Sequence, residues 1–221
     1  MSDRYVPSDV LGERPLVQVP RTTQSVGADA VSQAAARRVG LPAAWWGMAI
    51  FIASEGTLFG CLIGTYYYLR FAAPVWPPHG IPEPKVLVPL ILVGCLAATS
   101  APMQLAAFAA KRGRLAATRL FLVLALIVQC GYFAYEMHDY RDQLHRFDIT
   151  RDAYSSIYYT LLGADHAHVF VGIVFNVWLL WKLARGLTTY RLNAVQAIAF
   201  YWHAVNLITF FVIGTLLSAR V

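Results

Sequence analysis

Long apolar stretches alternate with short polar segments along the chain, and this pattern predicts five membrane-spanning helices. Crossing the hydrocarbon core of a bilayer, ~30 Å thick, takes an α-helix of about 20 residues. The expected spans cover residues 43–70, 85–110, 115–137, 153–181 and 193–218. The predicted fold class is therefore all-α, a polytopic membrane protein built as a bundle of five transmembrane helices.

The connections between these spans are short. Residues 72–84 hold five prolines and a glycine, which excludes a helix and predicts a stiff loop. Residues 138–152 contain four Asp, three Arg and two His, and we expect a polar loop there. Pro102 lies within the second span, where the missing backbone N–H predicts a kink.

The positions of the basic residues predict how the bundle is oriented. Residues 1–40 are polar and aperiodic, and we expect a mobile tail there, ahead of a transmembrane domain over residues 41–221. The tail and the segments 111–119 and 182–191 lie on one side of the membrane and carry 12 of the 18 Lys and Arg. Because Lys and Arg are enriched in cytoplasmic loops, the N-terminus is predicted to be cytoplasmic and the C-terminus to lie outside.

Composition agrees with a membrane protein, since 58% of the residues are hydrophobic and only 14% are charged. The net charge of +6 follows from the basic flanks of the spans, so no nucleic-acid partner is expected. The three cysteines lie singly in apolar runs, a spacing that indicates neither a disulfide framework nor a thiolate metal site.

A single charge, Glu55, interrupts the first apolar stretch. It lies 12 residues from Ala43, about 18 Å along a helix, and therefore near the bilayer midplane. A carboxylate there costs about 2.5–3.5 kcal/mol, so its side chain should face protein or water. His168 lies 13 residues from Trp181 in the fourth span, about 20 Å from the same side. The two residues are thus at one depth, and we expect them to meet.

Other spans offer polar side chains at this depth, and together they predict a buried polar layer. Helical geometry places Asp165 within about 60° of His168, and places His203 on the same face as Asn206. Thr99, Ser100 and Gln129 lie at a similar level. The candidate site residues are therefore Glu55, His168, Asp165, Asn206 and His203.

This layer has more than one reading. The pair of Glu55 and His168 is either a structural hydrogen bond that fixes helix packing or a direct participant in proton transfer. Metal binding by Asp165, His166 and His168 is disfavoured, because the two histidines project about 200° apart and no second convergent pair exists. Haem ligation by the spaced histidines, including His203, is a further interpretation, and the residues favour it only weakly. Aromatic residues at the end of the first span and in the loop beyond it suit an interfacial belt: Tyr66, Tyr67, Tyr68, Phe71 and Trp76.

Four stretches resemble subunit III of the haem–copper oxidases, in particular cytochrome c oxidase. They are WGMAIFIASEGTLFGCLIGTYYYLRF (46–71), VWPPHGIP (75–82), YYTLLGADHAHVFVGIVF (158–175) and AFYWHAVNLITFFVIG (199–214). With the matching order of spans, the resemblance covers nearly all of residues 43–218, in the short five-helix bacterial form.

Individual residues carry the resemblance. Glu55 matches the family's membrane Glu and His168 its second His in the fourth span, while Gly172 and Glu136 match a Gly and an acid of the family. Tyr201, Trp202 and His203 match the triplet of the final helix. Three positions depart from the pattern: Asp165 replaces a His, Asn206 an Asp and Phe133 a Gln.

The resemblance implies a non-catalytic subunit of a complex that reduces O2 to water and moves protons. Subunit I would be the direct partner, with subunit II and a cytochrome c or quinol donor in the same assembly. Haem and copper are expected in those subunits, and no catalytic or metal site in this chain. The resemblance further implies support of proton uptake into subunit I, and phospholipid between the helices. Tyr201, Trp202 and Trp76 are candidates for lipid contact or packing. The expected location is the bacterial inner membrane.

Two alternatives remain open from the sequence. A quinol oxidase or a nitric-oxide-reductase system has a related third subunit, although Glu55 and the Trp-Pro-Pro loop favour the cytochrome c branch. A small proton-coupled transporter would also place acids and histidines inside the membrane. The absence of repeat symmetry in the sequence disfavours it.

Overall fold

The computed structural model describes residues 43–81 and 86–220. The tail expected over residues 1–40 lies outside these ranges. The helices in chain order are α2 (Ala43–Ala72), α3 (Leu87–Ala98), α4 (Ser100–Lys111), α5 (Leu115–Arg146), α6 (Ala153–Leu183) and α7 (Thr189–Leu217), followed by a 3-10 turn (Ser218–Arg220). Five stretches are long and apolar enough to span a membrane, with α3 and α4 together forming one of them. The predicted all-α class and its five spans are confirmed.

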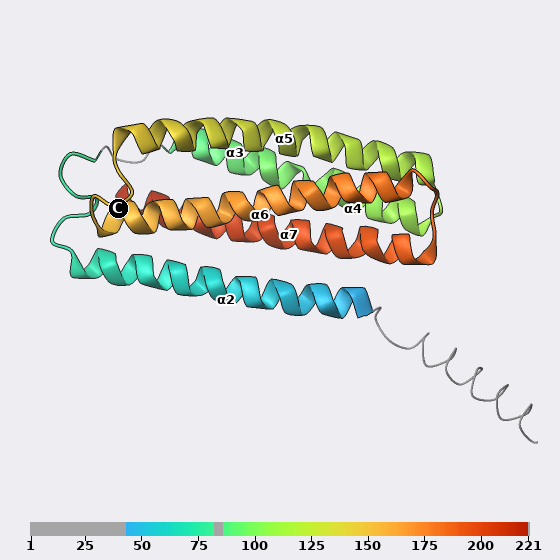
Figure 1. Ribbon diagram of the computed structural model, residues 1–221, viewed down its shortest axis with the longest axis horizontal. Helices are drawn as coiled ribbons and strands as arrows, with labels where there is room; N and C mark the ends of the chain where they lie inside the picture. The colour runs from blue at the N-terminus through green and yellow to red at the C-terminus, as the bar shows by residue number, and fades with distance from the viewer. Residues whose placement is uncertain (1–42, 82–85, 221) are drawn as a thin grey trace, which may run out of the picture. The chain divides into compact units, whose positions relative to one another are not determined.

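The helices run side by side along one axis (Figure 1). Helix α7 packs against α2, α3, α4 and α6, whereas α2 contacts only α6 and α7 among the described helices. The turns after α4 and α6 lie at one end of the bundle, and the loops after α2 and α5 lie at the other (Figure 1). Gly113 and Gly186 adopt φ of 69° and 98° in the first two of these turns, a backbone conformation that favours glycine. Which end faces the cytoplasm stays a prediction.

The second span is interrupted at Thr99, which separates α3 from α4. Pro102 has no N–H to donate to the carbonyl four residues earlier, so the helix loses a hydrogen bond at this point. The Thr99 hydroxyl donates to the Leu96 carbonyl, and the Thr99 backbone N–H bonds the same oxygen. The kink expected from Pro102 is therefore a break three residues before it.

The end of α5 was placed wrongly by the sequence pattern. The helix continues to Arg146, nine residues beyond the expected end at Met137, so most of the expected polar loop is helical. Charges alone do not stop a helix, and here two pairs spaced i to i+4 support it. The Gln143 amide donates to Asp139, and His138 lies 3.6 Å from Asp142. Helix α5 therefore extends well past its apolar part.

The connection that remains, between Arg146 and Ala153, is held by local hydrogen bonds. Backbone N–H and hydroxyl donation from Thr150 lowers the pKa of the exposed Asp148 carboxyl. Asp152 accepts from the backbone N–H of Ser155 at 2.7 Å and caps the start of α6. Asp148 thus stabilises the loop, and Asp152 stabilises the start of α6.

One member of the expected aromatic belt is instead buried. Tyr68 and Phe71 are exposed, as an interfacial belt requires, but Tyr66 is fully buried. The indole N–H of Trp76 donates to the Tyr66 hydroxyl at 3.1 Å, and the Trp76 ring packs edge-on against Tyr154. Trp76 therefore fastens the loop after α2 to two helices, which assigns it a packing role.

Gly172 of α6 lies directly against the Trp202 side chain of α7. A Cβ atom there would lie 2.5 Å from the Trp202 ring, so only glycine fits. The buried Trp202 indole N–H donates to the Thr99 hydroxyl at 2.6 Å. Trp202 of α7 thus packs on Gly172 of α6 and donates a hydrogen bond to Thr99 at the break in the second span. It thereby links three spans.

We predict that Gly172→Ala destabilises the bundle by about 1–3 kcal/mol, because the added methyl group overpacks the contact with Trp202. Chemical unfolding of the purified chain in detergent would measure this change. Gly131→Ala is the matched control, since a Cβ there meets nothing within 4 Å. Equal stability of the two variants would contradict the packing account.

Candidate functional site

Three ionisable residues at the middle of α6 point to three different neighbours. His168 contacts α2, His166 contacts α5 and Asp165 contacts α7. Helical geometry requires this divergence of the two histidines. The expected polar layer is thus arranged as separate pairs around α6.

The first pair joins α2 to α6. His168 Nε2 lies 2.8 Å from Glu55 Oε2, and the side chains are 17% and 20% exposed. Phe59, one turn from Glu55, lies edge-on to the imidazole ring. Tyr201 of α7 donates its hydroxyl to the His168 carbonyl at 2.9 Å. The acid and histidine that depth counting places together are therefore hydrogen-bonded.

The second pair joins α5 to α6 and was missed in the sequence. His166 Nε2 lies 3.2 Å from Glu136 Oε2, and both residues are buried. The expected end of α5 at Met137 placed Glu136 at the membrane surface. With the observed end at Arg146, Glu136 lies 10 residues inside the helix, close to the 13 residues that separate His166 from Ala153. The same depth count, applied to the longer helix, would have found the pair.

Hydrogen bonds to the backbone fix the tautomer of both histidines. Nδ1 of His166 faces the Leu162 carbonyl, and Nδ1 of His168 faces the Ala164 carbonyl at 2.7 Å. A carbonyl oxygen only accepts, so each Nδ1 carries a proton. The bond from Nε2 to the carboxyl group then needs one further proton, held by either partner. Each pair is therefore neutral when it contains this shared proton, and carries a buried negative charge when it is lost.

Asp165 lies between the two histidines in the sequence and is 1% exposed. Its Oδ1 atom accepts a hydrogen bond from the Thr209 hydroxyl of α7 at 2.7 Å. The shared face with His168 that the sequence predicted does not produce a direct contact, since His168 bonds Glu55. Thr209 was not among the expected residues, although a polar side chain one turn beyond Asn206 was a usable signal.

The remaining candidates join α7 to α4. The Asn206 amide donates to the Ser100 hydroxyl at 2.6 Å, and His203 Nε2 lies 3.0 Å from Gln104 Oε1. Both bonds follow from the shared face of His203 and Asn206. Gln129 accepts from the Asn176 amide at 3.1 Å, and Asn176 was not among the expected polar residues. Polar side chains thus cross-link the spans in pairs, as intramembrane packing favours.

No three His, Cys, Asp or Glu side chains within residues 43–81 and 86–220 converge as metal ligands would. Within these residues the site consists of hydrogen-bonded polar pairs, two of which join a glutamate to a histidine.

Comparison with known proteins places this sequence in a family. The family model described as Cytochrome c oxidase subunit III matches residues 28–217. A protein of Nocardia farcinica named Probable cytochrome c oxidase subunit 3 is 28% identical over 182 residues, which are 79% of this chain and 87% of the relative. Cytochrome c oxidase subunit 3 of Bacillus subtilis is 27% identical over 169 residues, 75% of this chain and 81% of the relative.

We predict a coupling energy of about 1–3 kcal/mol within each Glu–His pair, because removing one member leaves the other unsatisfied at depth. Double-mutant cycles with Glu55→Ala and His168→Ala, and with Glu136→Ala and His166→Ala, would measure it from the free energy of unfolding in detergent. The cycle of Glu55→Ala with His166→Ala is the control and should show little coupling. Additive effects within both pairs would contradict the assignment.

Proposed function

The chain belongs to the cytochrome c oxidase subunit III family and is subunit III of a haem–copper oxidase, and from this premise we propose that it packs directly on subunit I and supports proton uptake and stability there. Family membership also means that it works within an oxidase complex with other subunits. The observation that carries the proposal is the Glu55–His168 pair, which joins α2 to α6 and stays partly exposed.

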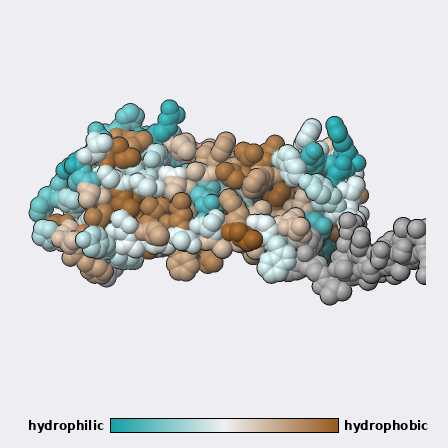
Figure 2. Space-filling view, turned by 60° about the horizontal axis from the view of Figure 1, so that its bottom comes forward, coloured by the Kyte–Doolittle hydropathy of each residue, from teal (hydrophilic) through white to brown (hydrophobic). Residues whose placement is uncertain are grey.

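Helix α2 is more exposed than the other four spans, although it carries a carboxyl group at its middle. Only Phe59 and Tyr66 are buried in it, whereas Ile50 and Leu58 are 70% and 45% exposed. Figure 2 shows the side of the bundle on which α2 lies, and a hydrophilic patch interrupts its apolar surface. With 20% of the Glu55 side chain exposed, contact with hydrocarbon would be unfavourable. A protein partner on this face removes that contact, and subunit I is the partner we propose.

The pair itself suits a supporting role in proton transfer. One proton shared between Glu55 and His168 can shift between them without leaving the neutral state, so the pair stores a proton at low cost. Because the pair is partly exposed beside α2, it would lie next to the surface that subunit I covers. We propose that it buffers the proton supply of subunit I, which performs the redox chemistry.

The rest of the assembly follows from the same premise. We propose that haem and copper reside in the partner subunits, that subunit II and cytochrome c complete the electron path, and that phospholipid fills spaces between helices. The proposed location is the bacterial inner membrane, with the basic turns at Lys111–Arg119 and Lys182–Arg191 on its cytoplasmic side. Lys182 lies 4.9 Å from the Trp181 ring centre, an arrangement suited to a membrane interface.

Affinity purification of the tagged full-length chain in mild detergent tests the assignment. We expect subunits I and II to co-purify, with an optical spectrum of a-type haem and bound copper in the complex. Vesicles that contain the chain alone should show no proton flux. A quinol oxidase would instead yield a subunit II without a dinuclear copper centre, and flux through the isolated chain would contradict the subunit assignment.

Two variants of Glu55 separate the structural role from the proton role. The amide of Glu55→Gln can donate to the bare Nε2 of His168 and keep the hydrogen bond, whereas Glu55→Ala cannot. We expect Glu55→Gln to assemble normally but to lose activity several times faster during turnover, and Glu55→Ala to assemble poorly. Ser54→Ala is the control, because Ser54 bonds only its own helix, at the Phe51 carbonyl. Inactivation of Glu55→Gln at the wild-type rate would contradict the proton role.

A further inference from the structure

A cavity opens beside Glu136 at the end of the bundle where α5 meets α6. Its volume is about 170 Å³, and its walls come from α3, α5, α6, α7 and the adjoining loops. Water occupies roughly 30 Å³ per molecule in the liquid, so the space accommodates several molecules. The cavity is separate from the Glu55–His168 pair, which does not line it.

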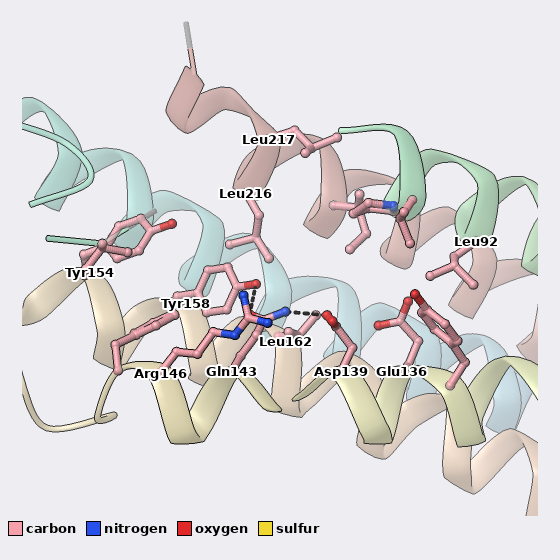
Figure 3. Close-up of a pocket in the computed structure, with 16 residues that line it drawn as sticks. Leu92, Glu136, Asp139, Gln143, Arg146, Tyr154, Tyr158, Leu162, Leu216 and Leu217 are labelled. Atoms are coloured by element: carbon pink, nitrogen blue, oxygen red, sulfur yellow. Dashed lines mark hydrogen bonds between the residues drawn. The ribbon is translucent and has the colours of Figure 1, made fainter. Parts of the chain in front are cut away.

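Polar side chains of α5 form a stripe along this cavity. Glu136, Asp139, Gln143 and Arg146 follow one another at helical spacing, and Figure 3 shows them in this order. Arg146 and Asp139 are exposed, Gln143 is partly buried, and Glu136 is only 8% exposed. The stripe thus descends from the surface to a buried carboxyl group in steps of about one helical turn, ~5.4 Å. Water molecules bridge such intervals readily.

The hydrogen bonds within the stripe do not involve Glu136, its most deeply buried carboxyl group. Gln143 donates to Asp139, and Tyr158 of α6 donates its hydroxyl to Gln143 (Figure 3). Glu136 bonds His166 through Oε2, and no protein hydrogen bond to its Oε1 atom is present among the described residues. That oxygen is therefore available to water in the cavity.

The other walls are apolar where they approach Glu136. Helices α3 and α7 contribute Val88, Leu92, Ile213 and Leu216, none of which is ionisable. Further ionisable groups near the pair come from α5 and α6: Tyr132, Tyr135, Tyr140, Tyr154 and Asp165. Among the described residues that line the cavity, the polar side chains available to water are therefore the stripe of α5 and the hydroxyl groups of Tyr135, Tyr154 and Tyr158.

We propose that this cavity is a proton-access vestibule, in which water exchanges the proton shared by Glu136 and His166 with the solution beyond this end of the bundle. The subunit would then hold two independent proton-binding pairs. The Glu55–His168 pair lies between α2 and α6, and the Glu136–His166 pair would open to solution along α5. This inference does not depend on the role proposed for Glu55.

Infrared spectroscopy of the intact complex transferred into heavy water tests the vestibule. The bands of the pair are those lost in Glu136→Gln, and either the carboxylic acid band or the imidazolium band shifts when deuterium replaces the shared proton. We expect rapid exchange in the wild type. Leu92→Trp fills the cavity beside Glu136 and should slow exchange by about tenfold or more, because it displaces the water.

The controls make every result informative. Ile91→Trp adds the same bulk at a neighbouring, 55% exposed position of α3 and should leave the exchange rate unchanged. Leu216→Phe fills the cavity from α7 and serves if Leu92→Trp fails to assemble. Slow exchange in the wild type, equal rates with the cavity filled, or slowing by Ile91→Trp as well would each overturn the proposal.

Discussion

A single proton shared between a carboxyl group and an imidazole is the interaction on which this bundle depends. Outside a membrane such a bond contributes little, since water replaces it. At the middle of five apolar spans its loss leaves a charge or an unsatisfied acceptor in a medium that solvates neither. Glu55 and Glu136 are tolerated because a histidine of α6, with its tautomer fixed by a backbone carbonyl, faces each of them. Helix α6 is therefore the element that makes both acids compatible with the membrane.

The close contact of α6 with α7 holds these pairs in register. Gly172 admits the Trp202 ring, the Trp202 indole satisfies Thr99, and the Tyr201 hydroxyl reaches the backbone of α6 at His168. The polar pairs thus rest on a tightly packed interior, while α2 keeps an open outer surface. For a subunit of a haem–copper oxidase, this division is appropriate: one side is tightly packed, and the other is available to a partner.

Much of this architecture could be predicted from the sequence, because membrane thickness converts residue number into depth. Counting from the basic turns placed Glu55 beside His168, and hydrophobic length placed the five spans. The depth count was wrong for α5, because the predicted end of that helix was wrong. The charged residues 138–146 resemble a loop but continue α5, so Glu136 was assigned to the surface and its pairing with His166 was missed. Tyr66 shows a related limit. Its depth suggested an exposed aromatic residue near the helix end, but packing against neighbouring side chains buries it, and depth alone does not predict that packing.

Solid-state nitrogen NMR of the histidine rings in the membrane-embedded complex tests the central claim most directly. The account predicts that His166 and His168 both carry a proton on Nδ1, and that the Nε2 resonance of each changes when its own carboxyl partner, and not the other, is replaced by glutamine. A bare Nδ1 on either ring, or Nε2 resonances insensitive to Glu55→Gln and Glu136→Gln, would contradict it.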